Sequence, residues 1–368
     1  DIADAPRTLL GKLTPCVGRE RELATLSATL RQCVSEPIAR AVLLSAPAGS
    51  GKTRLLSEFL RGARAIDQGA LVLSARCDAL SAGSPFAMAT DVLNRAAGVL
   101  SGESIAAKRT KLRARLGRHL SGEALRTVAE LLGEMAGAPL PASEASEALS
   151  AARADLIAMG DAIRMAWEDW LAAECATGPV VLAIEDLHWG DLPSVTLVDA
   201  ALRRLDERPF FVLATARPEV RATFPDLWNN RDLQEIRVSP LTPRASERLV
   251  REALGDAVDD ATVSFLARRA EGHPFFLEEL IRGVSDGHGP GSLPETVLGM
   301  LEGRLDALAP EVRRVLRAAS VLGQTFWRGG VAALVGGPIH PVARALDELA
   351  TREIILRRRT SRVANEIE

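Results

Sequence analysis

Short apolar runs alternate with amphipathic stretches along the first two thirds of the chain. Five runs have the length and apolar content of strands in a sheet: Ala41–Ser45, Ala70–Ser74, Pro179–Ile184, Pro209–Thr215 and Leu233–Val238. Three stretches carry apolar residues at helical spacing: Glu20–Leu30, before the first run, and Thr53–Leu60 and Leu192–Leu205, between later runs. Because strands separated by helices form a parallel sheet covered on both faces, the pattern predicts an α/β fold with a parallel-sheet core.

Two segments break this alternation. Helical patterning over residues 84–177, interrupted at 137–141, is too long for one connection and predicts a helical insert. From residue 241 to 349 only helices follow, with a glycine-rich break at 283–292, and the last apolar run, 353–359, predicts a strand. The predicted domains are a linker (1–16), an α/β domain (17–240), a helical lid (241–292) and a C-terminal domain (293–368).

Composition narrows the function classes. The net charge of -3, from 45 basic and 48 acidic residues, argues against a broadly basic surface for nucleic acid or anionic membrane. The four cysteines, at 16, 33, 77 and 175, lack zinc or disulfide spacing, which predicts free thiols and a cytoplasmic location. No apolar run approaches the roughly 18 residues of a membrane span, and no signal peptide is predicted. The start at Asp1, without Met, predicts a piece of a longer polypeptide.

The strongest motif is a phosphate-binding loop. Segment Ala46–Thr53 (APAGSGKT) fits the P-loop pattern, with Ala46 in place of the first glycine. Small residues are needed because backbone N–H groups must approach phosphate oxygens closely. Lys52 would bind the β- and γ-phosphates, and Thr53 would hold Mg²⁺. The predicted nucleotide-binding residues here are Ala48, Gly49, Ser50, Gly51, Lys52, Thr53 and Arg54. A simple Gly/Ser-rich turn is the alternative, and the strand before and helix after the motif disfavour it.

A second acidic motif ends the apolar run at 179–184. Glu185 and Asp186 follow it, and beside a P-loop they are candidates for a Walker B pair. One carboxylate would hold Mg²⁺ and the other would orient the attacking water. Glu185 is the preferred magnesium partner and Asp186 the preferred water-positioning acid, with the reverse assignment open. His188 could touch this site, although a structural role is the more common one for a lone histidine.

Two further features are candidates for sensing the nucleotide. Arg217 ends the apolar run at 209–215, at the edge of a parallel sheet where ligands bind, and could sense a γ-phosphate. A solvated arginine is the alternative. Gly272-His273-Pro274 separates predicted helices at 261–271 and 275–282, and by itself it is typical of a simple corner between helices.

Taken in order, these motifs resemble a known family. The shared segments are VGRERE (17–22), APAGSGKT (46–53), LAIEDLHWGD (182–191), TARP (215–218) and GHPFFLEEL (272–280). The chain is similar to AAA-related signal-transduction ATPases with numerous domains, the STAND class. The nearest resemblance is to the ATPase module of large bacterial regulators, which include LuxR-type transcription regulators, class III adenylate cyclases and serine/threonine kinases. The resemblance spans residues 15–365.

The resemblance implies further roles. Val17, Gly18 and Arg19 would lie near the adenine, and Pro274 would contact the nucleotide from the lid. Residues 293–368 resemble a winged helix that stops short of completion, so output and repeat domains would lie outside this chain. The chain departs from the family at Ala46, and at Glu185-Asp186, where two aspartates are common.

The function expected from these features is a regulatory switch that binds ATP or ADP with Mg²⁺ and hydrolyses ATP slowly. Its partners would be the attached output domains, and a ligand-induced oligomer is a further expectation; no membrane partner is expected. Two alternatives remain open. One is a P-loop enzyme acting on a second substrate. The other is a DNA-binding or scaffold module, for which Arg357, Arg358, Arg359 and Arg362 are a local basic cluster.

Overall fold

The computed structural model describes residues 8–66, 69–255, 258–289, 294, 296–358, 361, 363 and 366–368. The chain forms two compact units. The sheet unit consists of Glu22–Ala46 and Phe59–Arg237, and the loop unit consists of Asp1–Arg21, Pro47–Glu58 and Val238–Glu368. The predicted phosphate loop therefore groups with the C-terminal helices, although it directly follows a strand of the sheet in sequence.

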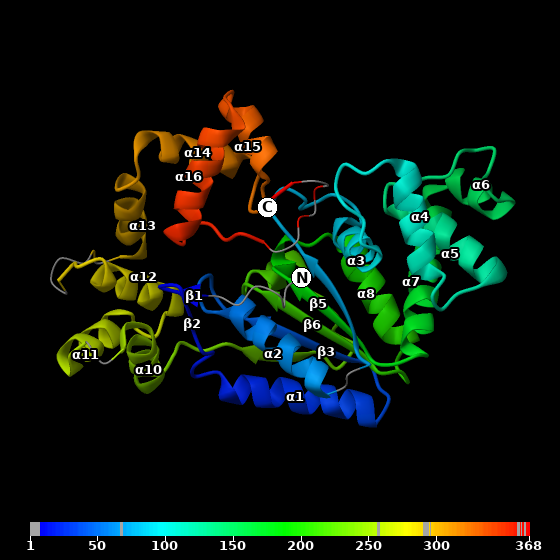
Figure 1. Cartoon of the computed structure of the whole chain (residues 1–368). Helices are drawn as coiled ribbons and strands as arrows, with labels where there is room; N and C mark the ends of the chain where they lie inside the picture. Colours follow the sequence, from blue (N-terminus) through cyan, green and yellow to red (C-terminus); the bar gives the residue numbers. More distant parts are fainter. Residues whose placement is uncertain are drawn as a thin grey trace. The chain divides into compact units, whose positions relative to one another are not determined.

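The sheet unit is built on one parallel sheet (Figure 1). Its five strands are β3 (Arg40–Ser45), β4 (Leu71–Arg76), β5 (Val180–Glu185), β6 (Phe210–Ala216) and β7 (Gln234–Arg237). They lie in the order β4-β5-β6-β3-β7, and every neighbouring pair is parallel. All five predicted strands are confirmed. Because the strands are parallel, the residues that follow β3, β5 and β6 leave the sheet at the same edge.

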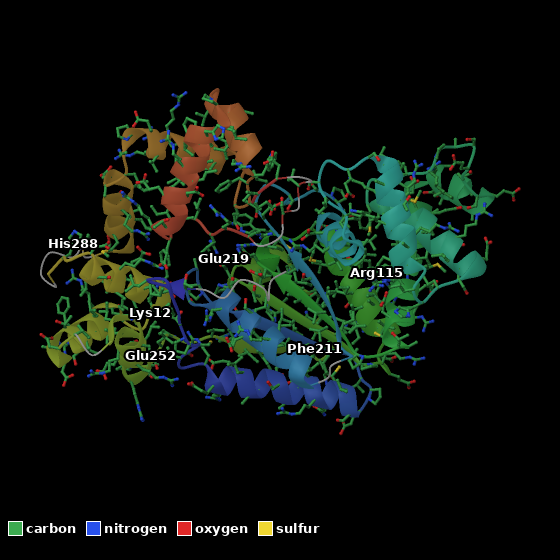
Figure 2. The ribbon with its side chains drawn as sticks, viewed as in Figure 1. Lys12, Arg115, Phe211, Glu219, Glu252 and His288 are labelled. Carbon is green, nitrogen blue, oxygen red and sulfur yellow. The ribbon has the colours of Figure 1, made fainter. Side chains whose placement is uncertain are left out.

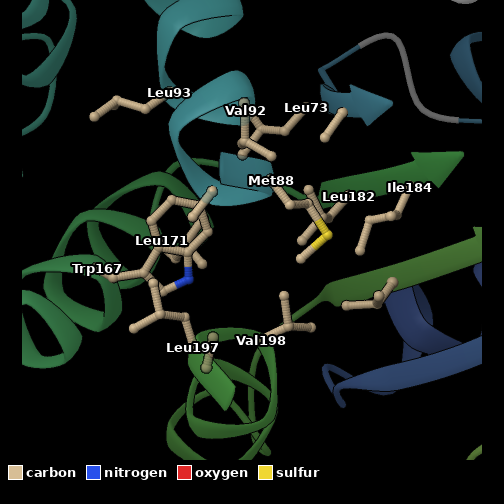
Figure 3. Close-up of a cluster of buried hydrophobic side chains, with 14 of the residues drawn as sticks. Leu73, Met88, Val92, Leu93, Trp167, Leu171, Leu182, Ile184, Leu197 and Val198 are labelled. Carbon is tan, nitrogen blue, oxygen red and sulfur yellow. The ribbon is translucent and has the colours of Figure 1, made fainter. Parts of the chain in front are cut away.

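Apolar side chains cover both faces of this sheet. Alternate residues of β5, including Leu182 and Ile184, pack with Trp167 and Leu171 of the helix that precedes it (Figure 3). On the other face, the ring of Phe211 lies 5.7 Å from the ring of Phe59. Each fully buried side chain of this size contributes about 1.5–3 kcal/mol to folding. The helices around the sheet are α1 (Glu20–Ser35), α2 (Lys52–Ile66), α8 (Leu192–Arg204) and α9 (Val220–Thr223), with the short 3-10 helix η1 (Leu187–Trp189).

The residues predicted as a helical insert are helical. They form α3 (Ala87–Ala97), α4 (Ile105–Leu116), α5 (Gly122–Met135), α6 (Glu147–Arg153) and α7 (Leu156–Cys175). A buried carboxylate joins two of these helices: Glu174 of α7 accepts hydrogen bonds from Arg115 of α4 at 2.5 Å and from the Trp170 indole at 2.8 Å. Arg115 is labelled in Figure 2. Among the helices that the structure describes, none is long and apolar enough to cross a bilayer.

The four cysteines are free thiols, as predicted. Burial raises the pKa of Cys33 and of Cys175 to about 12. Burial also raises the pKa of Cys77, and that of Cys16 despite the nearby Arg54. Since the thiolate is the reactive form, the three buried thiols, Cys33, Cys77 and Cys175, behave as small apolar core groups.

The loop unit starts with a hairpin that the polar sequence of its first residues did not predict. Strands β1 (Thr8–Leu9) and β2 (Lys12–Leu13) pair antiparallel. The apolar side chain of Leu9 is buried in the core that three helices share. These helices are α10 (Pro243–Leu254), α11 (Asp260–Arg269) and α12 (Pro274–Ser285).

The C-terminal helices have a core of their own. They are α13 (Val297–Asp306), α14 (Pro310–Val321), α15 (Arg328–Val335) and α16 (Ile339–Thr351). The last three bury Val312, Val331 and Leu349 against one another. This helical region agrees with the prediction for residues after 240.

The strand predicted at 353–359 is wrong for the described residues 353–358, which form a turn and a bend and then have no regular structure. Glu353 has φ +53°, in the left-handed region, so it cannot continue a strand. The amide of Ile354 instead returns to the carbonyl of Leu349 at 2.9 Å, which closes the end of α16. Arg359 lies outside the described residues.

Buried charges connect α12 to α13 and to the turn after α16. Glu279, with a side chain 1% exposed, accepts hydrogen bonds from Arg282 at 2.7 Å and from Arg304 at 2.8 and 2.9 Å. Arg282 also donates to Glu353 at 3.0 Å. Glu353 in turn accepts the Gly11 amide at 3.0 Å. Burial raises the pKa of Glu353, but the hydrogen bonds from Gly11 and Arg282 outweigh it, so the pKa lies below its ordinary value.

Candidate functional site

The phosphate loop has the backbone of an anion cradle. Gly49 and Gly51 have φ of +74° and +86°, values that favour glycine, and α2 begins at Lys52. Within the described part of the chain, the amides of Ala48, Gly49, Ser50 and Gly51 donate no hydrogen bond to protein. Successive amides of this kind at the start of a helix form a concave site of positive potential. The cradle therefore fits a phosphate group.

Lys52 is held over this loop. Its side chain is almost fully buried, and Nζ donates to the carbonyl of Pro47 at 2.8 Å. The same carbonyl accepts the Ser50 hydroxyl at 2.9 Å. A buried ammonium that donates to a neutral carbonyl of the loop is well placed to exchange that bond for one to a phosphate oxygen, since charged acceptors form stronger hydrogen bonds.

The segment Val17–Arg19 lies beside the loop. Val17 is buried with the helices α10–α12, and Gly18 has φ +67°, where a Cβ atom would lie 2.7 Å from Cβ of Ala245. The buried Arg19 donates to the carbonyl of Ser50 at 3.1 Å and to that of Ser239 at 2.7 Å. Two of the predicted nucleotide-binding segments are therefore in direct contact within the loop unit.

Arg54 is tied to the same N-terminal segment. Its guanidinium donates to the carbonyl of Thr14. The residue thus connects the first turn of α2 to the chain leading into Val17.

The Gly272-His273-Pro274 corner also meets the phosphate loop. Gly272 has φ +74°, and a Cβ atom there would lie 2.3 Å from the Leu241 carbonyl oxygen, so only glycine fits. His273 is the N-cap of α12, and its Nε2 lies 3.1 Å from the Ala48 carbonyl oxygen. The predicted helix corner is confirmed. The contact of His273 with the loop was not predicted, because the motif alone does not indicate which residue the histidine faces.

In the sheet unit, the two candidate acids lie in different environments. Glu185 is the last residue of β5 and is 3% exposed. Asp186 has φ +55°, its amide donates to the Thr215 hydroxyl at 3.2 Å, and its carboxylate lies 3.7 Å from the Arg76 guanidinium. Arg76 ends the neighbouring strand β4 and was missed in the sequence, since only the strand order brings it beside Asp186.

Other residues of the acidic motif organise this edge of the sheet. The Arg217 amide donates to Nδ1 of His188 at 3.4 Å, while the Arg217 side chain is exposed. Asp191 is buried and accepts the amides of Ser194, Phe86 and Met88 at 2.9, 2.8 and 3.1 Å. Asp191 therefore caps α8 and fixes the start of α3.

Comparison with known proteins agrees with this architecture. Residues 15–213 match the AAA ATPase domain, which is more than half of the chain. The chain belongs to the AAA ATPase domain family. An uncharacterized protein of Rhizobium meliloti is 30% identical over 326 residues, which cover 84% of this chain and 30% of that protein. The chain thus spans about 30% of the length of this curated relative.

This chain is also similar to solved structures of the Thermotoga maritima protein RuvB. A RuvB variant aligns with a TM-score of 0.40 and 14% identity, covering 95% of this chain and 92% of RuvB. The RuvB Holliday junction branch migration motor aligns with a TM-score of 0.38 and 16% identity over the same shares.

Proposed function

We propose that the chain is an ATP-dependent switch module that binds ATP or ADP with Mg²⁺ and hydrolyses ATP slowly. One observation carries this proposal. The amides of residues 48–51 have no protein acceptor in the described chain, while Arg19 and His273 occupy the carbonyl side of the same loop. The loop is thus built to present donors to an anion.

The roles in binding follow from this arrangement. Lys52 would bind the β- and γ-phosphates after leaving the Pro47 carbonyl, and Thr53 would hold Mg²⁺. Bound Mg²⁺ would neutralise phosphate charge. Segment Val17–Arg19 is proposed to border the adenine, and Pro274 to contact the nucleotide. A Cβ atom on Gly51 would lie 3.9 Å from Cγ of Pro274, which supports a position for Pro274 at the loop.

Two acids are proposed to take part in hydrolysis, each with its own role. Glu185 is proposed to hold the metal and Asp186 to orient water. Arg76 supports this division, because its ion pair with Asp186 gives that carboxylate a fixed direction while Glu185 stays buried at the strand end. The reverse assignment is distinguished by the variants described in the Discussion.

The proposed output is regulatory. A switch needs a part that responds to nucleotide. Within the loop unit the phosphate loop contacts the start of α12, and α12 is joined to α13 by the Glu279–Arg304 ion pair. The chain spans about 30% of the length of its curated relative, which supports a place as one module of a longer protein. That this protein is a cytoplasmic signalling protein, such as a transcription regulator, cyclase or kinase, is part of the proposal. We also propose that residues 293–368 belong to a winged-helix domain. A ligand is proposed to induce an oligomer.

The DNA-binding alternative gains no support from the described arginines of the basic cluster. Arg357 is paired with Asp347, and Arg358 lies 3.7 Å from Glu368. Arg359 and Arg362 lie outside the described residues. No described feature favours a second substrate.

The test is calorimetric titration of the chain with ATP and ADP in the presence of Mg²⁺. The parent should bind both nucleotides, and Lys52→Ala should lose most of the ATP affinity because a charged phosphate contact is removed. Lys108→Ala in α4 is the matched control and should bind like the parent. Equal ATP affinity of Lys52→Ala and Lys108→Ala would refute the proposed function.

A further inference from the structure

Donors from distant parts of the loop unit hold the carbonyl side of the phosphate loop. The Ala48 carbonyl accepts from His273 Nε2 at 3.1 Å, and the Gly49 carbonyl accepts from the Phe275 amide at 3.2 Å. The Ser50 carbonyl accepts from Arg19 at 3.1 Å. Consecutive carbonyls are therefore each fixed by a different donor outside the loop.

A peptide group has two faces that turn together. The carbonyl of one residue and the amide of the next lie in one rigid plane and point in opposite directions. A donor on the Ala48 carbonyl therefore sets the direction of the Gly49 amide, and a donor on the Ser50 carbonyl sets that of Gly51. Hydrogen bonds in such a chain also polarise one another, by about 10–30% per bond. The donors thus orient and strengthen the amides that face the anion.

The ring of His273 is fixed in one tautomer. Nδ1 accepts the Phe276 amide at 3.2 Å as the N-cap of α12, so the proton of the neutral ring is on Nε2. Nε2–H then donates to Ala48. A Cβ atom on Gly49 would lie 2.4 Å from Cε1 of His273, so the ring is closely packed against the loop.

We propose that His273 and Arg19 are positioning residues for the phosphates, acting through the carbonyls of Ala48 and Ser50. The inference rests on the proposed function and deepens it. His273 belongs at once to α12 and to the phosphate loop. Its contact with the loop couples the docking of α12 to the binding of phosphate. Docking of α12 raises the phosphate affinity, and bound phosphate favours the docked helix by the same factor.

The test compares His273→Asn with the matched control His288→Asn. Asparagine still caps α12, but it is too short to reach the Ala48 carbonyl. His288 lies beyond the other end of α12 and is exposed (Figure 2). The ligands are ATP and inorganic tripolyphosphate, titrated with Mg²⁺ by calorimetry, and thermal unfolding shows whether the fold is intact.

His273→Asn should weaken ATP and tripolyphosphate by the same factor, about two- to tenfold, the range for one net hydrogen bond. Its unfolding midpoint should match that of His288→Asn. His273→Ala, which also loses the cap, should bind like His273→Asn but unfold earlier. Arg19→Lys should weaken both ligands too, because one ammonium cannot reproduce the geometry of the two guanidinium donors.

Unchanged tripolyphosphate affinity in His273→Asn overturns the inference, whether or not ATP is affected, since the histidine would then act on the base or not at all. This result differs from failure of the proposed function. In that case the parent binds no ATP, or Lys52→Ala binds it normally, and the inference fails with it.

Discussion

Replacing Glu279 by glutamine tests the buried charges of the loop unit. Glutamine keeps the shape of the side chain, but it removes the charge and places an amide donor against one of two guanidinium groups. In the parent, Glu279 is 1% exposed and accepts from Arg282 and Arg304. Removing one partner of a buried ion pair costs about 3–5 kcal/mol.

The structure reduces this figure. In the variant, Arg282 still donates a hydrogen bond to Glu353, at 3.0 Å in the parent, and Arg304 still donates one to the carbonyl of Arg352, at 2.6 Å. A cavity of about 310 Å³ borders the cluster and is large enough to admit water. We therefore expect Glu279→Gln to lower the free energy of unfolding of the loop unit by about 2–3 kcal/mol.

Urea unfolding followed by circular dichroism measures the change. Glu302→Gln is the matched control, because Glu302 is an exposed carboxylate of α13, and it should stay within about 0.5 kcal/mol of the parent. The double variant Glu279→Gln/Arg304→Gln should cost less than the two single changes together, since neither charge is then left without its partner. If Glu279→Gln is as stable as Glu302→Gln, the ion pairs do not stabilise the unit and the reasoning is wrong.

Three further predictions concern the candidate site and the C-terminal turn. Glu185→Gln should weaken Mg-ATP binding, whereas Asp186→Asn should preserve binding and slow the release of phosphate. If instead Asp186→Asn weakens binding and Glu185→Gln only slows phosphate release, the metal is assigned to Asp186. If both variants hydrolyse ATP like the parent, this strand is excluded from catalysis. Arg217→Ala should reduce discrimination between ATP and ADP and leave ADP affinity nearly intact. Pro274→Ala should weaken the binding of both nucleotides by about 1–2 kcal/mol, measured by calorimetry. If Arg217→Ala weakens ATP and ADP binding equally, Arg217 is a solvated arginine and no γ-phosphate sensor. Because the folded pKa of Glu353 is lowered, its stabilisation is present above the ordinary value of 4.5 and is lost as the pH falls through the folded pKa, so Glu353→Gln should lower the melting temperature at neutral pH and little in acid.

The elements of the sheet unit could be predicted because each carries its own signal. A run such as Val180–Ile184 is apolar at every position, as a strand covered on both faces must be. The strand order carries no local signal, which is why Arg76 was not connected with Asp186. The turn at Glu353 was mispredicted because its left-handed backbone is held by tertiary hydrogen bonds that apolar neighbours do not indicate.

The phosphate loop illustrates the same limit within one site. Gly49 and Gly51 indicate the amide face, because only small residues allow the amides to approach a ligand. The carbonyl face depends on Arg19 and His273, and His273 lies 225 residues from Ala48 in sequence. No spacing within the loop can indicate such partners.

This division between the two faces has a consequence for regulation. A ligand shifts an equilibrium only through different affinities for its two states. If the loop were rigid by itself, phosphate would bind equally well whatever the position of α12, and nucleotide could not control that helix. Because the Ala48 carbonyl depends on His273 and the Gly49 carbonyl on Phe275, release of α12 frees the peptide groups whose amides face the phosphate. The affinity of the loop for phosphate and the position of α12 therefore have to change together, which is the physical requirement for a nucleotide-dependent switch.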